Sequence, residues 1–353
     1  MRLTAPEARK NFPMLRSKIA GVGGYVPPHL VRNEDLEQEM QISADAIERR
    51  TGIRQRYWAD HDPSLATSDL ALVAAQRALE HAGLPKESLG LILVATLSPD
   101  AMAPSTACFL QKKLDVPGIP AFDLRAQCSG FLYGLELADL YIKAGVHEHV
   151  LLVCAELQSK LLDRTPRGRN VTVLFGDGAG AVVVSATHVE DASVRGGASL
   201  VHSTHLHSDG AMLGHLLWQH PGTMNPRFVT PGLELELCSF PQMKGRELYD
   251  ICLERMPAVT HACLAKNGIA ARDIDLFVIH QSNARINQDY ADALGVPHAR
   301  VYSTIERFGN TTAATIPLGL SEAVREGVLK PGMLVLSCSF GSGLSWGAGL
   351  YRW

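Results

Sequence analysis

Short apolar runs rich in β-branched residues alternate along the chain with longer segments in which apolar residues recur at helical spacing. The runs that predict strands are Leu91–Thr96, Ala121–Leu124, Val150–Cys154, Leu276–His280 and Met333–Ser337. The segments that predict helices are Ser68–Ala82, Gly130–Ala144, Gly245–Lys266 and Asn310–Glu326. Because the strands are almost continuously apolar, we expect sheets buried on both faces and covered by helices, which is an α/β fold.

Two glycine-rich strands with a similar pattern suggest that the chain consists of two similar halves. The first is Gly178–Ser185 and the second is Gly343–Tyr351. A repeated unit of this kind is typical of duplicated architectures. We therefore predict an N-terminal extension at residues 1–16, a first half at 17–186 and a second half at 187–353.

The pattern is interrupted between His202 and Met243, where the sequence is irregular and rich in Gly, Pro and His. A long irregular stretch inside a regular chain is either a functional loop region or an exterior excursion. The residues alone leave both interpretations open.

Composition and charge exclude several classes of protein. Apolar residues make up 46% and charged residues 20%, as in a globular chain, and a net charge of −3 gives no general attraction to nucleic acid or anionic membrane. The seven cysteines are scattered without zinc-ligand spacing, so we expect reduced thiols, no metal and a cytoplasmic protein. Neither a signal peptide nor a membrane-spanning run is recognisable.

Cys128 is a candidate nucleophile because it follows the strand Ala121–Leu124 and precedes a helix. Free backbone N–H groups and the positive end of the dipole at a helix N-terminus favour thiolate over thiol. The alternative is that Cys128 is a small buried apolar residue, which is what most cysteines are.

His280 and Asn310 are candidate partners of this cysteine. His280 follows an apolar strand, at the sheet edge where α/β proteins place their sites, and Asn310 precedes a predicted helix. Alternatively, His280 is a structural hydrogen-bonded residue and Asn310 an ordinary N-cap. A Cys, His and Asn set fits a papain-like protease or a thioester-condensing enzyme, and the surroundings typical of a papain-like cysteine are absent.

Several longer motifs resemble the beta-ketoacyl-acyl-carrier-protein synthase III family, in its order and spacing, from about Ser17 to the C-terminus. They are Arg49–Arg54, Ala121–Phe131, Phe175–Ala181, Ser203–Gly210, His280–Asn283, Arg307–Thr311 and Phe340–Gly347. The resemblance implies a thiolase fold, with two βαβαβαββ-like halves in a layered α-β-α-β-α arrangement, and a homodimer.

The resemblance also implies an activity. Cys128, His280 and Asn310 fall on the family's catalytic positions, so Cys128 would accept an acyl group from acyl-CoA. Decarboxylating malonyl-acyl-carrier protein would then condense with this group to give a 3-oxoacyl product. The backbone N–H groups of Cys128 and Ser342 would form the oxyanion hole, and no metal or redox cofactor would be required.

Further positions are matched to binding roles by the resemblance. Arg50, Thr51 and Arg167 would contact the nucleotide end of CoA, Asn283 the pantetheine arm, and Arg285 the acyl carrier protein. The acyl pocket would include Ala103 and Met243.

The sequence departs from the family where substrate choice is decided. Ala46 stands where members carry a tryptophan that stacks on adenine, and Ser342 interrupts a run of glycines. Ala103 stands where acetyl-primed members often carry a bulky aromatic residue, so we expect a primer longer than acetyl. A related enzyme of secondary metabolism or acyl degradation, with malonyl-CoA or a second acyl-CoA as acceptor, is the main alternative, and a non-condensing acyl-binding relative is a more distant one.

Overall fold

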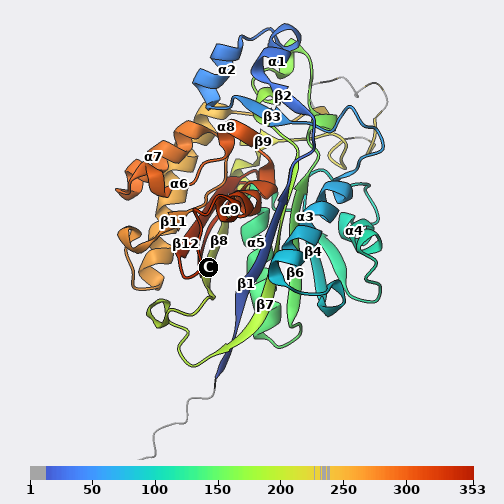
Figure 1. The fold of residues 1–353 in the computed structure, drawn as a ribbon. Helices are drawn as coiled ribbons and strands as arrows, with labels where there is room; N and C mark the ends of the chain where they lie inside the picture. Colours follow the sequence, from blue (N-terminus) through green and yellow to red (C-terminus); the bar gives the residue numbers. More distant parts are fainter. Residues whose placement is uncertain (1–12, 226, 231, 233–235, 237–238) are drawn as a thin grey trace, which may run out of the picture.

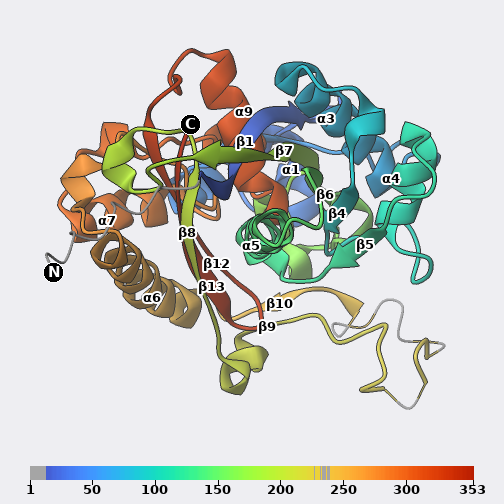
Figure 2. The same cartoon turned by 90° about the horizontal axis from the view of Figure 1, so that it is seen from below.

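Two sheets with helices between them and on both outer sides form the body of the molecule (Figures 1 and 2). The computed structural model describes residues 13–225, 227–230, 232, 236 and 239–353. Most of the predicted N-terminal extension, residues 1–12, lies outside the described residues. Among the described residues, no helix is long and apolar enough to cross a membrane.

The first sheet is built from the N-terminal half of the chain. Its strand order is β1 (Met14–Tyr25), β7 (Gly178–Val189), β6 (His149–Glu156), β4 (Leu91–Ala95) and β5 (Ala121–Leu124). Strand β4 is parallel to β5 and β6, whereas β7 is antiparallel to β6 and β1. Helices α3 (Thr67–Ala82) and α4 (Thr106–Leu114) cover its outer face. Helix α3 approaches β1 so closely that a Cβ on Gly23 would lie 2.3 Å from the Ala74 carbonyl oxygen.

The second sheet is built from the C-terminal half. Its order is β11 (Leu276–Phe277), β12 (Leu334–Gly341), β13 (Ser345–Arg352) and β8 (Val201–Ser208). Helices α6 (Gly245–Lys266) and α7 (Ala284–Leu294) pack on its outer face. Helices α5 (Gly130–Lys143) and α9 (Thr315–Arg325) lie between the two sheets, as Figure 2 shows.

Three apolar cores hold these layers together. The central core joins both sheets through α5 and α9, with residues such as Phe131, Val182, Ile316 and Val335. The other two cores lie on the outer faces, beneath α3 and α4 and beneath α6 and α7. Burial of apolar side chains at about 25 cal/mol per Å² is the main force that stacks such layers.

A smaller unit lies over one end of the layers, at the top of Figure 1. It comprises β2 (Leu30–Arg32), α1 (Asn33–Met40), α2 (Ala44–Thr51), β3 (Gln55–Tyr57) and α8 (Ile305–Phe308). Its own core contains Leu36, Met40, Ile47 and Trp58. The unit matters because α2 forms part of the wall of the cavity described below.

The predicted elements are largely confirmed, with two corrections. The stretch from His202 was expected to be irregular, but β8 occupies Val201–Ser208 and pairs with β13. Irregular backbone follows only beyond β8, with the short pair β9 (Leu216–Leu217) and β10 (Gln242–Met243). The helix predicted from Asn310 begins at Thr315 instead. The division into halves after residue 186 stays a prediction, and β7 continues to Val189.

Candidate active site

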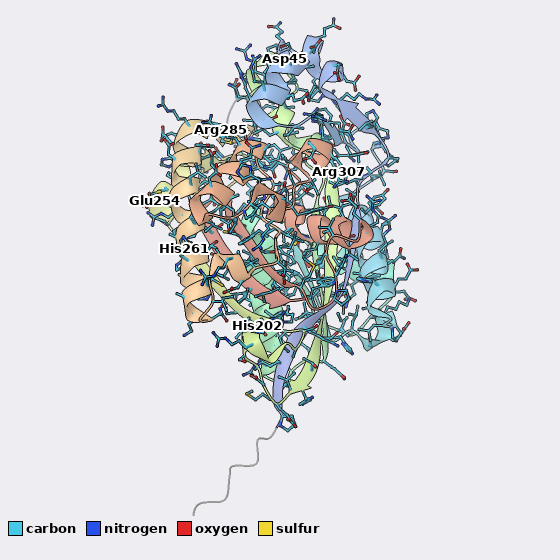
Figure 3. The ribbon with its side chains drawn as sticks, turned by 60° about the vertical axis from the view of Figure 1, so that its left-hand side comes forward. Asp45, His202, Glu254, His261, Arg285 and Arg307 are labelled. Carbon is cyan, nitrogen blue, oxygen red and sulfur yellow. The ribbon has the colours of Figure 1, made fainter. Side chains whose placement is uncertain are left out.

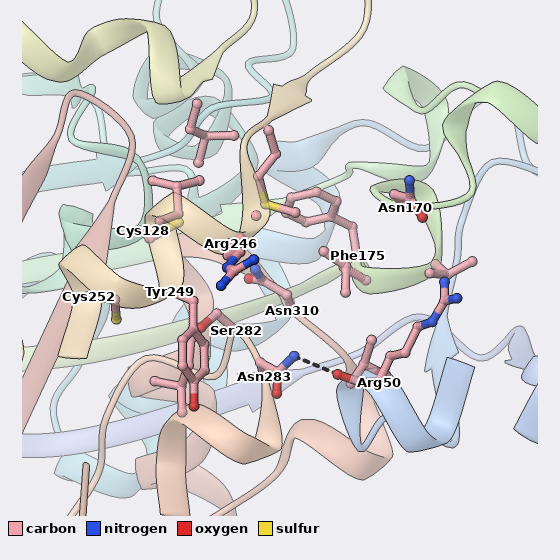
Figure 4. A pocket seen from close by; sticks show the side chains of 18 of the residues that line it. Arg50, Cys128, Asn170, Phe175, Arg246, Tyr249, Cys252, Ser282, Asn283 and Asn310 are labelled. Atoms are coloured by element: carbon pink, nitrogen blue, oxygen red, sulfur yellow. Dashed lines mark hydrogen bonds between the residues drawn. The ribbon is translucent and has the colours of Figure 1, made fainter. Parts of the chain in front are cut away.

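One cavity of about 480 Å³ brings together the three residues predicted to carry the chemistry. Cys128 comes from the turn between β5 and α5, His280 from the segment that follows β11, and Asn310 from the segment before α9. Figure 4 shows Cys128 and Arg50 on opposite sides of the cavity, with Asn310 between them. The remaining lining is mostly apolar and includes Ile47 from α2. Such a cavity suits a flexible chain that delivers a reactive group to Cys128.

Cys128 sits in a tight strand-to-helix turn. A 3₁₀ turn at Gln127–Ser129 directly precedes α5, and Gln127 has a φ of 43°, in the left-handed region. The end of β12 approaches the cysteine closely, because a Cβ on Gly341 would lie 2.8 Å from the Cys128 Cβ. Glycine is therefore required at position 341 if the strand is to reach the nucleophile.

The resting state of Cys128 differs from the sequence-based expectation of a thiolate. Burial, together with the negative charge of Glu156, raises the pKa of the Cys128 thiol to about 12. The backbone N–H groups of Cys128 and Ser342 act in the opposite direction but do not offset the burial. The thiol is therefore protonated at neutral pH, and its proton must be removed as it attacks.

The same two N–H groups are those expected to form an oxyanion hole. Both interact with the Cys128 sulfur, so both converge on the position where an acyl carbonyl would be attacked. Ser342 has no positive φ, so a residue with a Cβ fits there. Its hydroxyl donates to the Leu216 carbonyl at 2.6 Å and is not directed at the sulfur.

His280 is held by backbone and side-chain hydrogen bonds. Its N–H donates to the Cys338 carbonyl at 2.8 Å, which continues the pairing of β11 with β12. Its Nδ1 lies 2.8 Å from the Thr315 Oγ1, and the Thr315 hydroxyl donates to the Thr312 carbonyl at 3.0 Å. Because that hydroxyl already uses its proton, Nδ1–H of His280 is the donor, and Nε2 carries a lone pair. Burial lowers the pKa of His280 to about 4, so the ring is neutral at pH 7.

Asn310 is not a helix N-cap, which corrects the structural alternative considered for it. It pairs with Phe175 in an isolated β-bridge, and its Oδ1 accepts the Thr312 N–H at 2.8 Å. Thr312 has a φ of 52°, so the chain cannot enter α9 until Thr315. A β-branched residue in this region costs on the order of 1–3 kcal/mol. With Oδ1 engaged, the Asn310 Nδ2 group is the one left to donate to a ligand, because no described residue accepts from it.

Four of the residues matched to binding roles line the same cavity: Arg50, Thr51, Asn283 and Met243. Asn283 caps α7 through a bond from the Arg285 N–H to its Oδ1, and its Nδ2 donates to the Arg50 carbonyl at 3.0 Å (Figure 4). The Thr51 hydroxyl donates to the Ile47 carbonyl at 2.7 Å. These bonds fix the wall of the cavity opposite Cys128.

The other matched residues lie outside this cavity. Arg167 lines a neighbouring one, where its Nε lies 2.6 Å from the Asp163 carboxylate. Ala103 is exposed beside Met102, whose side chain is 64% exposed. Arg285 lies on α7 at the outer surface (Figure 3), with its guanidinium carbon 5.4 Å from the centroid of the Tyr249 ring. Ala46 is half-buried on α2.

Several residues of the site were not found from the sequence. Thr315 and Thr312 orient His280 and Asn310, and Arg246 and Tyr249 line the cavity from α6. A threonine pair near Asn310 was visible in the sequence, but nothing in its spacing shows which atoms face the histidine. The Tyr249 side chain is itself held in place, because its hydroxyl donates to the Asp289 carboxylate.

The fold and this cavity define a condensing enzyme of the thiolase type, and comparison with known proteins identifies the family. Residues 122–210 match the model described as 3-Oxoacyl-[acyl-carrier-protein (ACP)] synthase III, and residues 264–353 match its C-terminal counterpart. The chain is 41% identical over 336 residues to the beta-ketoacyl-[acyl-carrier-protein] synthase III of Nitratidesulfovibrio vulgaris (strain DP4). This match covers 95% of the chain and 98% of the relative.

Solved structures lead to the same family. The 3-oxoacyl-[acyl-carrier-protein] synthase III from Aquifex aeolicus VF5 is 38% identical, with a TM-score of 0.85, over 96% of this chain and 100% of that one. The priming beta-ketosynthase from the R1128 polyketide biosynthetic pathway is 30% identical, with a TM-score of 0.84, over 98% of both chains. The chain therefore belongs to the beta-ketoacyl-acyl-carrier-protein synthase III family and has its thiolase fold.

Proposed function

We propose that this enzyme condenses an acyl-CoA primer with malonyl-acyl-carrier protein, with loss of CO₂, to give a 3-oxoacyl product. The observation that carries this proposal is the convergence of Cys128, His280 and Asn310 in one apolar cavity, with the N–H groups of Cys128 and Ser342 at the sulfur. The matched family and the 41% identical relative supply the substrate class.

In the first half-reaction, the neutral His280 acts on the protonated thiol. Its Nε2 lone pair accepts the Cys128 proton as the sulfur attacks the thioester carbonyl. The two N–H groups stabilise the resulting oxyanion, and one such donor contributes about 3–4 kcal/mol in comparable sites. The C–S bond to CoA then breaks, and the CoA thiolate takes the proton from Nε2. Cys128 is left as an acyl thioester.

In the second half-reaction, the thioester oxygen of the malonyl group lies against the Asn310 Nδ2 group and the His280 Nε2. The bond to the carboxylate breaks, CO₂ leaves, and its electron pair forms an enolate. Because Thr315 holds the Nδ1 proton, His280 donates to the enolate only after Nε2 takes up a second proton from solvent, the one proton that this half-reaction consumes. The negative charge of the enolate favours that uptake. The enolate carbon then attacks the acyl thioester and expels the Cys128 thiolate, which takes this proton.

We propose that the primer is longer than acetyl, because Ala103, which lies outside the cavity of its own chain, has a small side chain and would line the acyl pocket of a second copy. The test is intact-mass measurement of Cys128 loading with acyl-CoA thioesters from acetyl to dodecanoyl. We expect the fastest loading beyond butyryl, and the variant Ala103→Phe should shift the preference toward acetyl. An acetyl optimum in the unmodified protein, with no loading beyond butyryl, would contradict the proposal.

The acceptor distinguishes this function from its main alternative. The 30% identical priming beta-ketosynthase shows that a chain of this type can serve another pathway. Acyl-loaded enzyme should release CO₂ from malonyl-acyl-carrier protein at least tenfold faster than from malonyl-CoA, about 1.4 kcal/mol of discrimination. Equal rates with malonyl-CoA, or product formed from a second acyl-CoA alone, would favour the alternative.

We propose further that two copies of the chain pair along β5 and that the protein acts in the cytoplasm. Strand β5 is at an edge of its sheet, and the groove beside it is lined by Leu124, Tyr133 and Leu140. The side chain of Leu140 is 54% exposed, and an open edge with apolar neighbours is a natural site for a second strand. Ala103 would then lie close to the pairing surface, as a role in a partner's acyl pocket requires.

We also propose binding roles for the cationic residues near the cavity. Arg50 lines its mouth and would meet the phosphates of CoA, with Arg167 in the adjoining cavity. Asn283 would contact the pantetheine arm through the second proton of its Nδ2 group, since the first is bonded to Arg50. Arg285, exposed on α7, would contact the acidic surface of an acyl carrier protein.

A further inference from the structure

Glu156 is a buried carboxylate directly behind the site, and the reaction described above does not use it. It ends β6 and has no exposed surface. Its two oxygens each lie 3.1 Å from the Leu97 nitrogen, and the Ser98 hydroxyl donates to Oε2 at 2.8 Å. A buried carboxylate is tolerated only when such donors surround it, so the position is costly to maintain for packing alone.

The donors on one side of Glu156 belong to the segment that leads to Ala103. Ser98 also accepts the Leu157 N–H at 2.9 Å, and the Thr67 hydroxyl donates to the Ser98 carbonyl. Further along, Asp100 accepts the Ser68 N–H at 2.9 Å. Residues 97–100 are thereby fixed to Glu156 at one end and to α3 at the other.

The donor on the opposite side of Glu156 leads to the catalytic pair. Gln158, which is 1% exposed, donates from Nε2 to the Glu156 Oε2 at 3.1 Å, and the same Nε2 lies 3.4 Å from the Thr312 Oγ1. The backbone of Thr312 in turn holds Asn310 through its N–H, at 2.8 Å. Its carbonyl holds Thr315, which orients His280.

Thr312 is a residue that its surroundings must constrain. Its φ of 52° is unfavourable for a β-branched side chain. A conformation of this kind persists only where neighbouring groups hold it. The Gln158 amide is the side-chain donor that reaches the Thr312 hydroxyl from the first sheet.

We propose that Glu156 and Gln158 are positioning residues for the decarboxylation half-reaction. They hold Thr312, and through its N–H they hold Asn310, in the geometry that stabilises the enolate, and they connect Asn310 to the segment 97–100 that leads to Ala103. The inference rests on the proposed function, because it assigns these residues to one of its two half-reactions.

The two half-reactions respond differently to loss of this connection. Loading of Cys128 depends on the two backbone N–H groups and on the His280 Nε2, and His280 is also held independently of Thr312 by its backbone bond to the Cys338 carbonyl. Enolate formation depends in addition on Asn310, whose only described anchor for Oδ1 is the Thr312 N–H. A change at Gln158 should therefore slow CO₂ release more than acyl loading.

The test uses Gln158→Leu, with Gln111→Leu as the matched control. Gln111 also donates a part-buried bond, 2.6 Å to the Ile119 carbonyl, but lies on α4 away from the cavity. Loading is followed by intact mass in a single turnover with hexanoyl-CoA, and CO₂ release from malonyl-acyl-carrier protein is followed with enzyme already loaded. For Gln158→Leu we expect kcat for CO₂ release to fall at least tenfold, with KM and the loading rate within twofold.

Three results would overturn the inference. They are an equal loss in both half-reactions, CO₂ release within twofold of the unmodified enzyme, and a similar selective loss in Gln111→Leu. Thermal unfolding shows whether each variant is folded, and if Gln158→Leu is not, Glu156→Gln is the second variant, with the same selective loss expected. Failure of the proposed function is distinguishable, because the unmodified enzyme would then release no CO₂ at all.

Discussion

At the scale of single residues, the site is governed by burial. Burial keeps the Cys128 thiol protonated and the His280 ring neutral, so the pair begins the reaction without charge. Charge then appears only when substrate is present and the two N–H groups can stabilise it. The sequence identified both residues, but their protonation states depend on packing that no local motif reveals.

The raised pKa of Cys128 predicts how it reacts with a small alkylating agent. Only the thiolate reacts, and at pH values well below the pKa of about 12 its fraction rises tenfold per pH unit. The rate of Cys128 modification by iodoacetamide, followed by intact mass, should therefore rise about tenfold per unit from pH 6 to pH 9. A rate that levels off below pH 8 would show a stabilised thiolate and contradict this description.

Glu156 predicts a dependence of stability on pH. Burial raises its pKa to about 7 in the folded protein, above the ordinary value of 4.5, so the folded state binds the proton more tightly. Stability from this group is then present below about pH 4.5 and is lost as the pH rises toward 7, by up to about 3 kcal/mol. This loss is measured as the free energy of unfolding in urea, for the unmodified protein and for Glu156→Gln, at pH 5 and at pH 8.

In that comparison, the unmodified protein should lose stability relative to Glu156→Gln between pH 5 and pH 8. Groups that titrate in both proteins, such as Asp177, largely cancel in the difference. An unchanged difference, or a gain for the unmodified protein at pH 8, would show that Glu156 is charged at both pH values.

At the scale of elements, the site depends on how closely strand and helix ends approach one another. A Cβ on Gly341 would clash with Cys128, so Gly341→Ala should lower the rate of Cys128 loading at least tenfold and destabilise the fold by about 1–3 kcal/mol. Loading by intact mass and urea unfolding measure the two effects. Gly210→Ala is the control, because nothing lies within 4 Å of a Cβ there. Equal loading by both variants would show that the approach is not needed.

The sequence predicted elements well where periodicity was strong and poorly where side chains override it. Helix α6 was predicted at Gly245–Lys266 and lies there. The start of α9 was misplaced because the bond from the Thr312 N–H to Asn310 delays the helix. Strand β8 was missed because polar residues such as His202, Thr204 and His207 occupy an edge strand of the second sheet.

The candidate site shows the same limit. The sequence alone identified Cys128, His280 and Asn310. Cys128 and His280 each follow a recognisable strand, and Asn310 lies in a recognisable motif. Thr312, Thr315 and Glu156 were not, because their roles arise from hydrogen bonds between segments distant in the chain, such as Gln158 to Thr312. Such pairings follow from how the two sheets stack rather than from local sequence.

At the scale of the whole molecule, the two halves supply different parts of one site. The first half contributes Cys128, and the second contributes His280, Asn310 and the Ser342 N–H. The stacking of two sheets around α5 and α9 is what brings these groups within reach. The fold thus explains why one reaction centre draws its residues from segments that are distant in the chain.

Pairing of two copies is tested by sedimentation velocity. The unmodified chain should sediment at twice its mass, and Leu140→Lys should shift it toward the monomer because a charge would be buried at the proposed interface. Val328→Lys, at a side chain 39% exposed elsewhere, should leave the dimer unchanged. A monomeric unmodified protein, or an unaffected Leu140→Lys dimer, would contradict the proposed interface.

The measurement that tests the central claim most directly is intact-mass analysis of the protein after exposure to a mixture of acyl-CoA thioesters. We predict the addition of a single acyl group, located on Cys128 by peptide mapping and removed when malonyl-acyl-carrier protein is added. Cys128→Ala should show no acylation and no condensation. Acylation at another residue, or condensation by Cys128→Ala, would contradict the account.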